Sequence, residues 1–203
     1  MIELFFKTFI FYFIVIDPIG STPVFLVVTE HLDIKEKIKA AGQGTFIAAL
    51  ILLFFGLLGN GILAYLNISF PAFTIAGGII LFIIALEMLF DKRQQRKEEN
   101  INFTSDKLSI FPLATPLLAG PAAITSVIVF VTATGHDFTK QTIGMLALVA
   151  VTLITFIILF IAAKSEKIIN KKIISVFSRI VAIVLAGLSI QYILDGIKAF
   201  INL

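Results

Sequence analysis

Hydrophobic residues along this chain come in long runs separated by short polar segments, a pattern typical of membrane-spanning helices. A helix needs about 20 apolar residues to cross the ~30 Å hydrocarbon core of a bilayer. Runs of this length cover residues 45–66, 70–90, 143–163 and 180–200 almost without interruption. Residues 4–28 and 108–134 form two further runs, which are interrupted by prolines. The pattern predicts an all-α membrane protein with six transmembrane helices.

Lysine and arginine gather in alternate connections between these runs. With six crossings, one side of the membrane holds 13 of the 16 basic residues and the other side holds three. Cytoplasmic loops are enriched in lysine and arginine, so the basic side is expected in the cytoplasm and both termini outside. If the two proline-containing runs dipped in and returned, the division would be 11 to 5. The charge pattern favours six crossings and leaves the re-entrant arrangement open.

The two proline-containing runs share a local pattern, offset by 98 residues. Each has two prolines five residues apart, and each proline follows a residue type that caps helices. The pairs are Asp17-Pro18 and Thr22-Pro23 in the first run, and Thr115-Pro116 and Gly120-Pro121 in the second. A capping residue followed by proline is a signal for the start of a helix. Both runs are therefore predicted to be broken at their paired prolines, inside the membrane.

A second correspondence links the third and sixth predicted helices, where Glu87 and Gln191 stand 104 residues apart. Three helices in each half is an odd number, so the second half enters from the opposite face, as in the inverted repeats of many secondary transporters. We expect one transmembrane domain over 1–203, with repeats at 1–91 and 108–203 and a cytoplasmic linker at 92–107. Asp33 and Glu36 form a capping-box pattern that predicts a short surface helix over 34–41.

Composition excludes several classes of function. The chain is 59% hydrophobic and only 14% charged, against about 25% charged residues in soluble domains. It has no cysteine, and its two histidines, His31 and His136, lie far apart in the sequence. No catalytic or nucleotide-binding motif is present. We expect no enzyme activity, no metal, no cofactor and no nucleic-acid partner, with membrane lipid and a small solute as the partners and the oligomeric state left open.

The predicted breaks indicate where a solute would bind. Broken backbone within a membrane is tolerated only inside protein or beside water, and helix N-termini attract anionic groups. A zwitterionic solute suits such a site. The predicted substrate-binding residues are Asp17, Gly20, Ser21, Thr22, Thr115, Ala119, Gly120 and Thr125. For the hydroxyl residues, the alternative is a hydrogen bond to their own helix.

Asp17 is the deepest carboxylate in the predicted membrane region. An ionised group at mid-membrane costs about 2.5–3.5 kcal/mol on insertion scales. Asp17 is therefore a structural cap for the helix at Pro18, a site for ammonium, Na⁺ or H⁺, or both. Glu87 and Gln191 are further candidates for ion coupling, with an interfacial carboxylate and an interhelical hydrogen bond as their alternatives. Tyrosines 12, 65 and 192 are expected to anchor the chain at the membrane interface.

Three segments carry a resemblance to a known family. The sequences DPIGSTPVF at 17–25, IAGG at 75–78 and PLATPLLAGP at 112–121 resemble those of MarC/SnatA-like membrane proteins. The resemblance implies a six-span protein of the bacterial inner membrane that transports neutral amino acids. This chain differs in having Ser21 where the family often has Asn, Thr115 where it has an aliphatic residue, and Ala122 where it has Gly.

These observations together favour one function. The protein is expected to be a secondary transporter, and an exporter, of small neutral amino acids or similar small polar solutes. The solute would be held at mid-membrane between the two broken helices. A passive pore and a non-transporting accessory protein are the alternatives.

Overall fold

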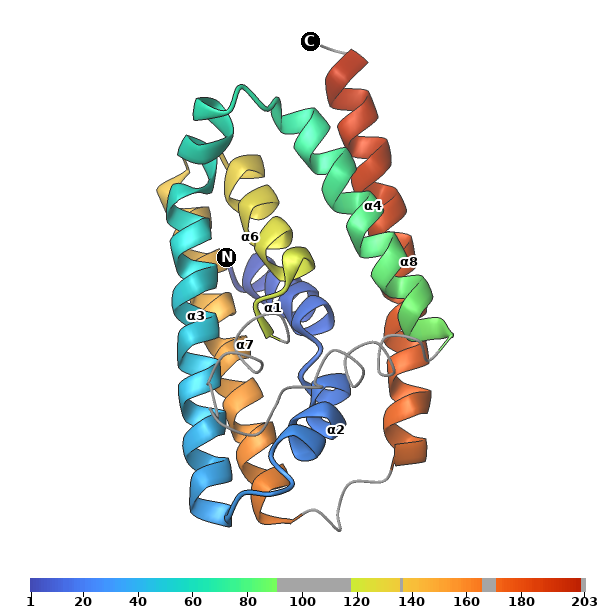
Figure 1. The fold of residues 1–203 in the computed structure, drawn as a ribbon. Coiled ribbons are helices and arrows are strands. Elements are labelled where there is room, and N and C mark those ends of the chain that lie inside the picture. The colour runs from blue at the N-terminus through green and yellow to red at the C-terminus, as the bar shows by residue number, and fades with distance from the viewer. Residues whose placement is uncertain (91–117, 136, 166–170, 202–203) are drawn as a thin grey trace.

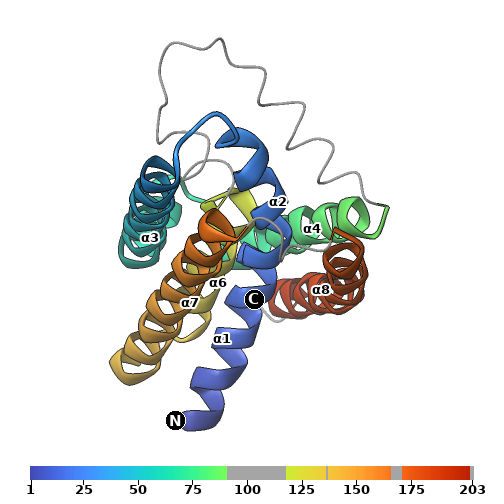
Figure 2. The ribbon, with the colours of Figure 1, turned by 90° about the horizontal axis from the view of Figure 1, so that it is seen from below.

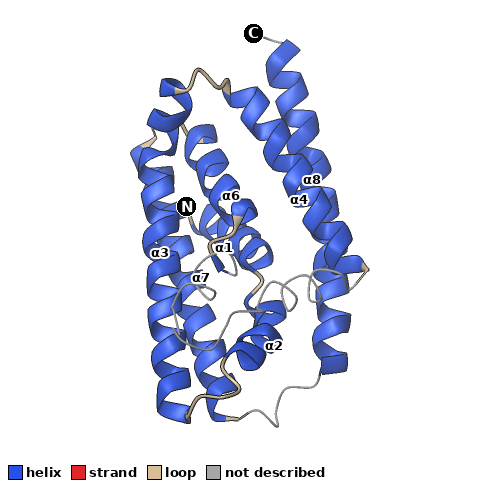
Figure 3. Cartoon of the chain, viewed as in Figure 1, coloured by secondary structure: helices blue, strands red, loops and turns tan. Residues whose placement is uncertain are grey.

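A computed structural model describes residues 1–90, 118–135, 137–165 and 171–201. These residues form helices joined by short loops, and no strand occurs among them (Figures 1 and 3). The helices are α1 (Ile2–Ile16), α2 (Pro18–Val28), α3 (Ile34–Tyr65), α4 (Phe70–Leu89), α6 (Pro121–Ala133), α7 (Phe138–Lys164) and α8 (Lys171–Ile201). The predicted linker 92–107 and the Thr115-Pro116 pair lie outside the described residues.

Five helical segments are long and apolar enough to cross a membrane, α1 and α2 counting together as one span. The others are α3, α4, α7 and the part of α8 from Ile174 to Ile201. Large apolar side chains point outward from these helices, among them Leu57, Leu146 and Ile183, each more than half exposed. Their surroundings in a membrane are lipid. The predicted all-helical, multi-span protein is confirmed, although α6, with 13 residues, is shorter than a full span.

The interrupted helices occupy the middle of the bundle. Figures 1 and 2 show α1, α2 and α6 between two helix pairs, α3 with α7 on one side and α4 with α8 on the other. The α2–α3 connection and the end of α7 lie at the lower end of Figure 1, and the α3–α4 connection and the end of α8 lie at the upper end. The chain therefore places its broken backbone where protein surrounds it on both sides, as the low polarity of a membrane requires.

Helices α4 and α8 run antiparallel at very short range. A Cβ atom at Gly78 would lie 2.8 Å from the carbonyl oxygen of Ser189, and one at Gly196 would lie 3.0 Å from that of Pro71. The first distance is shorter than real Cβ atoms show, and the second would require the neighbouring carbonyl to shift. The two glycines therefore allow backbone to pack on backbone, the usual role of small residues between membrane helices.

Helix α3 begins as predicted but does not end as predicted. The capping box is present: the Glu36 N–H donates to Asp33 Oδ1 at 2.8 Å, and the Asp33 N–H donates to Glu36 Oε2 at 3.2 Å. The prediction of a separate surface helix over 34–41 is wrong, because α3 continues without a break to Tyr65. Gly42 does not end the helix, since this face packs on Phe156 of α7, 3.4 Å from where a Gly42 Cβ would be.

Candidate functional site

The first helix break is a single residue, Asp17. Its φ of 53° and ψ of 63° are left-handed, so it ends α1 and begins α2. Its N–H donates to the carbonyl of Phe13 at 3.0 Å, and its carboxylate accepts from the Gly20 N–H at 3.0 Å. Asp is one of the few residues other than Gly that adopt this conformation readily. One helix thus ends and the next begins at Asp17-Pro18, and the Asp17 side chain caps α2.

Asp17 is also buried, with 4% of its surface exposed. Gly20 lies directly against it, because a Cβ atom at Gly20 would overlap the Asp17 carboxylate. Gly20 was predicted as a substrate-binding residue; in the structure it provides the room in which the Asp17 carboxylate reaches the α2 backbone. The two residues thus form one unit.

The second proline of this segment does not break the helix. Pro23 lies inside α2, so the prediction that Thr22-Pro23 starts a helix is wrong. Proline has a helical φ; inside a helix it removes one hydrogen bond and its ring crowds the carbonyl four residues earlier, which can kink a helix without ending it. The Thr22 hydroxyl donates to the Pro18 carbonyl at 2.9 Å, within its own helix.

The second break lies at Gly120-Pro121. Pro121 is the first residue of α6, and Gly120 precedes it in extended conformation with φ −76° and ψ 172°. A helix therefore starts at Pro121, directly after Gly120. Unlike α2, α6 has no side-chain hydrogen bond from its N-cap residue, which is a glycine. The helix starts at Pro18 and Pro121 are 103 residues apart, whereas the two proline pairs are offset by 98 residues in the sequence.

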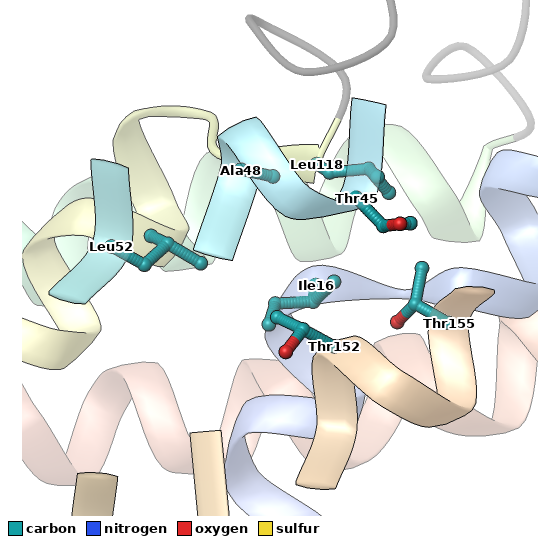
Figure 4. A pocket seen from close by; sticks show the side chains of 7 residues that line it. All are labelled: Ile16, Thr45, Ala48, Leu52, Leu118, Thr152 and Thr155. Atoms are coloured by element: carbon teal, nitrogen blue, oxygen red, sulfur yellow. The ribbon is translucent and has the colours of Figure 1, made fainter. Parts of the chain in front are cut away.

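The segments before the two helix starts meet in one place. Ile16, at the end of α1, and Leu118, just ahead of Gly120, line the same small space between α3 and α7 (Figure 4). The remaining lining residues are Thr45, Ala48 and Leu52 of α3 and Thr152 and Thr155 of α7. The space has no room for a water molecule, so its lining side chains fill it.

Three threonines line this space, and the hydroxyl of each donates to its own helix. Thr45 donates to Ala41 O at 2.8 Å, and Thr152 and Thr155 donate to carbonyls of α7 at 2.9 and 2.8 Å. A hydroxyl that donates in this way keeps its oxygen as an acceptor. The sequence analysis did not single out these residues. Their signal was the pair Thr152 and Thr155, three residues apart on one face of an otherwise apolar run.

Several predicted hydroxyl and small residues lie in the core around the breaks. Ser21, Thr22, Ala119 and Thr125 are buried. Thr125 packs its methyl group against α4, where a Cβ atom at Gly77 would overlap it. The structure thus brings most of the predicted residues into the interior of the bundle. For Thr22, it also shows the alternative, a hydrogen bond from the hydroxyl to a carbonyl of its own helix.

Glu87 and Gln191 do not come together. Gln191 is exposed, and its amide donates to Asp195 Oδ1 at 2.8 Å on the same helix. The expected interhelical bond is therefore replaced by one along α8. Glu87 is half-buried near the end of α4. Gly78 lies against both Ser189 and Ile193 of α8 and is therefore level with Gln191, so Glu87, nine residues further along α4, lies ~13 Å from Gln191 along the helix axes at 1.5 Å per residue.

One tyrosine assignment is also wrong. Tyr65 is 88% exposed, as an interfacial residue would be, but Tyr12 is only 1% exposed. Its ring lies edge-on to Phe130 of α6 with the ring centroids 6.0 Å apart. Tyr12 is therefore a residue of the bundle interior. The position of a tyrosine within an apolar run does not distinguish an exposed from a buried side chain, because burial depends on whether a neighbouring helix covers that face.

The fold defines a class of protein: a multi-pass integral membrane protein whose interrupted helices lie between two antiparallel helix pairs. More specifically, the chain belongs to the MarC family. The model of this family, described as MarC family integral membrane protein, matches residues 2–201. This confirms the resemblance seen in the three sequence segments.

Curated relatives cover nearly the whole chain. A UPF0056 membrane protein of Methanocaldococcus jannaschii is 35% identical over 189 residues, 92% of each chain. One from Archaeoglobus fulgidus is 32% identical over 97% of this chain and 93% of its own, and one from Buchnera aphidicola is 30% identical over 92% of each. No solved structure matches this chain.

Proposed function

We propose that this protein is a secondary transporter, and an exporter, of small neutral amino acids or similar small polar solutes. It would work in a bacterial inner membrane with both termini outside. One observation carries the proposal: Ile16 and Leu118, which precede the two helix starts, line one space between α3 and α7. A transport site at mid-membrane between discontinuous helices is the arrangement found in many secondary transporters.

The two helix starts differ in a way that suits a zwitterion. The start of α2 already holds a carboxylate, that of Asp17, on the Gly20 N–H. The start of α6 has no side-chain cap, and free N–H groups at a helix start attract a carboxylate. We infer that the solute carboxylate binds at α6 and its ammonium lies toward Asp17. The carboxylate of Asp17 would then also be the coupling site for H⁺ or Na⁺, with Glu87 and Gln191 as more distant contributors.

The packing supports an inverted repeat of residues 1–91 and 108–203. The N-caps of α3 and α7, Asp33 and Asp137, are 104 residues apart, close to the spacing of Pro18 and Pro121. Corresponding helices also pair with each other, α3 with α7 and α4 with α8, and both pairs are antiparallel. Two halves related by an in-plane twofold axis would pack in this way. The linker 92–107 would then lie in the cytoplasm.

The alternatives fit these features less well. A passive pore that excludes cations relies on the positive field of helix starts, and the Asp17 carboxylate would reduce that field. A non-transporting accessory protein has no need for broken backbone at its centre. Neither alternative accounts for an acidic residue that is only 4% exposed at the break.

Proteoliposomes provide the direct test. Purified protein should give saturable uptake of labelled alanine, glycine or serine that depends on a proton or sodium gradient. Unlabelled solute on the opposite side should accelerate the exchange, which a pore would not show. Absence of gradient-dependent flux for all three amino acids would contradict the proposed function.

A further inference from the structure

The Tyr12 side chain contains a buried hydroxyl that the fold does not use. Tyr12 is 1% exposed, and its oxygen has no hydrogen-bond partner among the described residues. Buried hydroxyls normally find a partner, because an unpaired one has lost its water without compensation. A phenylalanine would fill the same volume without this cost. The hydroxyl therefore calls for an explanation other than packing.

The ring of Tyr12 is held by apolar contacts that do not involve the hydroxyl. It lies edge-on to Phe130, at an interplanar angle of 65°, and next to Phe11, at a centroid distance of 5.7 Å. Phe130 is itself fixed against α7, where a Cβ atom at Gly144 would overlap its ring. The position of Tyr12 between α1, α6 and α7 is thus set by aromatic packing. Removing the oxygen should leave the ring in place.

Tyr12 lies on the same face of α1 as Ile16, which lines the space between α3 and α7; we call this the central space. Residues four apart in a helix lie on the same side, so Tyr12 lies directly above Ile16, which lines the space between the two breaks. Thr8, four residues earlier, is also buried, with 4% exposed. Thr8, Tyr12 and Ile16 therefore form a line along the interior face of α1, from its N-terminal end to the space.

We propose that Tyr12 is a solute-positioning residue, whose O–H donates to the carboxylate of a small zwitterionic solute on its way between the central space and the N-terminal end of α1. This inference rests on the proposed function and adds a specific residue to it. The hydroxyl, which has no partner among the described residues, gains one when the solute passes. The phenol O–H can donate to the carboxylate of any small amino acid, so it contributes affinity rather than discrimination among side chains.

Replacement of Tyr12 by Phe removes only the hydroxyl group and therefore tests the proposal directly. In proteoliposomes, Tyr12→Phe should raise the KM for labelled alanine by about tenfold or more, as for a lost hydrogen bond to a charged group, while the maximal rate changes less. The melting temperature of the purified variant should equal or exceed that of the original chain. Tyr65→Phe makes the same chemical change at an exposed tyrosine and should alter neither quantity.

The possible results distinguish a failure of the Tyr12 proposal from a failure of the proposed transport function. Gradient-dependent flux by the original chain with an unchanged KM in Tyr12→Phe overturns the role of Tyr12 alone. A lower melting temperature in Tyr12→Phe shows that the hydroxyl stabilises the fold and also overturns it. Absence of flux by the original chain contradicts the proposed function, and the role of Tyr12 with it.

Discussion

The carboxylate of Asp17 occupies the position where a side chain at residue 20 would begin, and it accepts the Gly20 N–H at 3.0 Å. The cap therefore requires glycine at the third position of α2. Asp17 and Gly20 were each predicted as solute-binding residues, yet their mutual contact is the feature that fixes the break.

Gly20→Ala is expected to lower the free energy of unfolding by about 0.5–2 kcal/mol, the value of a lost helix cap. The added Cβ atom displaces the Asp17 carboxylate. Gly61→Ala is the matched control, because a Cβ atom there meets nothing within 4 Å. It should stabilise α3 slightly, since Ala favours helix over Gly by about 1 kcal/mol. Thermal melting in detergent measures both, and equal melting temperatures would contradict the role of Gly20.

Asp17→Asn separates the cap from the charge. Asn caps helices about as well as Asp and tolerates left-handed backbone, so the variant should insert and melt like the original chain. If the carboxylate couples transport to a cation, gradient-dependent uptake should be lost. Normal coupled uptake by Asp17→Asn would leave Asp17 with a structural role only.

Asp17→Leu removes the cap and places a branched side chain in left-handed backbone. We expect a loss of about 0.5–2 kcal/mol for the cap and about 1–3 kcal/mol for the backbone strain. Reduced yield of folded protein and a lower melting temperature are the measurements. A Leu variant as stable as Asp17→Asn would show that the cap contributes little.

Gly78→Ala should weaken the α4–α8 pair. Its Cβ atom would lie 2.8 Å from the Ser189 carbonyl, which is backbone and cannot rotate away. Forced separation of packed helices costs about 1–3 kcal/mol. Gly187→Ala, on α8, meets nothing within 4 Å and serves as the control. Melting curves that do not distinguish the two variants would refute the close backbone contact.

The proposed topology is testable because the chain has no cysteine of its own. Single cysteines in place of Glu98 and Asn202 should react with a membrane-impermeant maleimide from opposite sides of the membrane. The Glu98 position is expected to label only after the cytoplasmic side is exposed. Labelling from the same side would contradict the inverted repeat together with the orientation.

Much of the fold follows from patterns that are local in the sequence. Apolar runs of sufficient length gave α3, α4, α7 and α8, and the capping box at Asp33 marked the start of α3 correctly. The Asp17-Pro18 and Gly120-Pro121 breaks were also predictable, because a cap and a proline act within one helical turn.

The predictions of helix ends and of burial were wrong where contacts between helices determine the structure. Pro23 has the same local context as Pro18, but it follows a helix that has already begun, and α2 continues through it. Helix α3 passes through Gly42 because α7 covers that face. The convergence of Ile16 and Leu118 and the burial of Tyr12 depend on contacts between helices far apart in sequence, which no local pattern encodes.

The single-residue junction between α1 and α2 has a mechanical consequence. The φ angle of Pro18 is fixed by its ring, so a change in the angle between the two helices must be taken up mainly by the dihedral angles of Asp17. Leaving the left-handed region would turn its carboxylate away from the Gly20 N–H. Bending of the helix and release of the carboxylate are therefore one event, so whatever binds Asp17 also sets the tilt of α1 against α2.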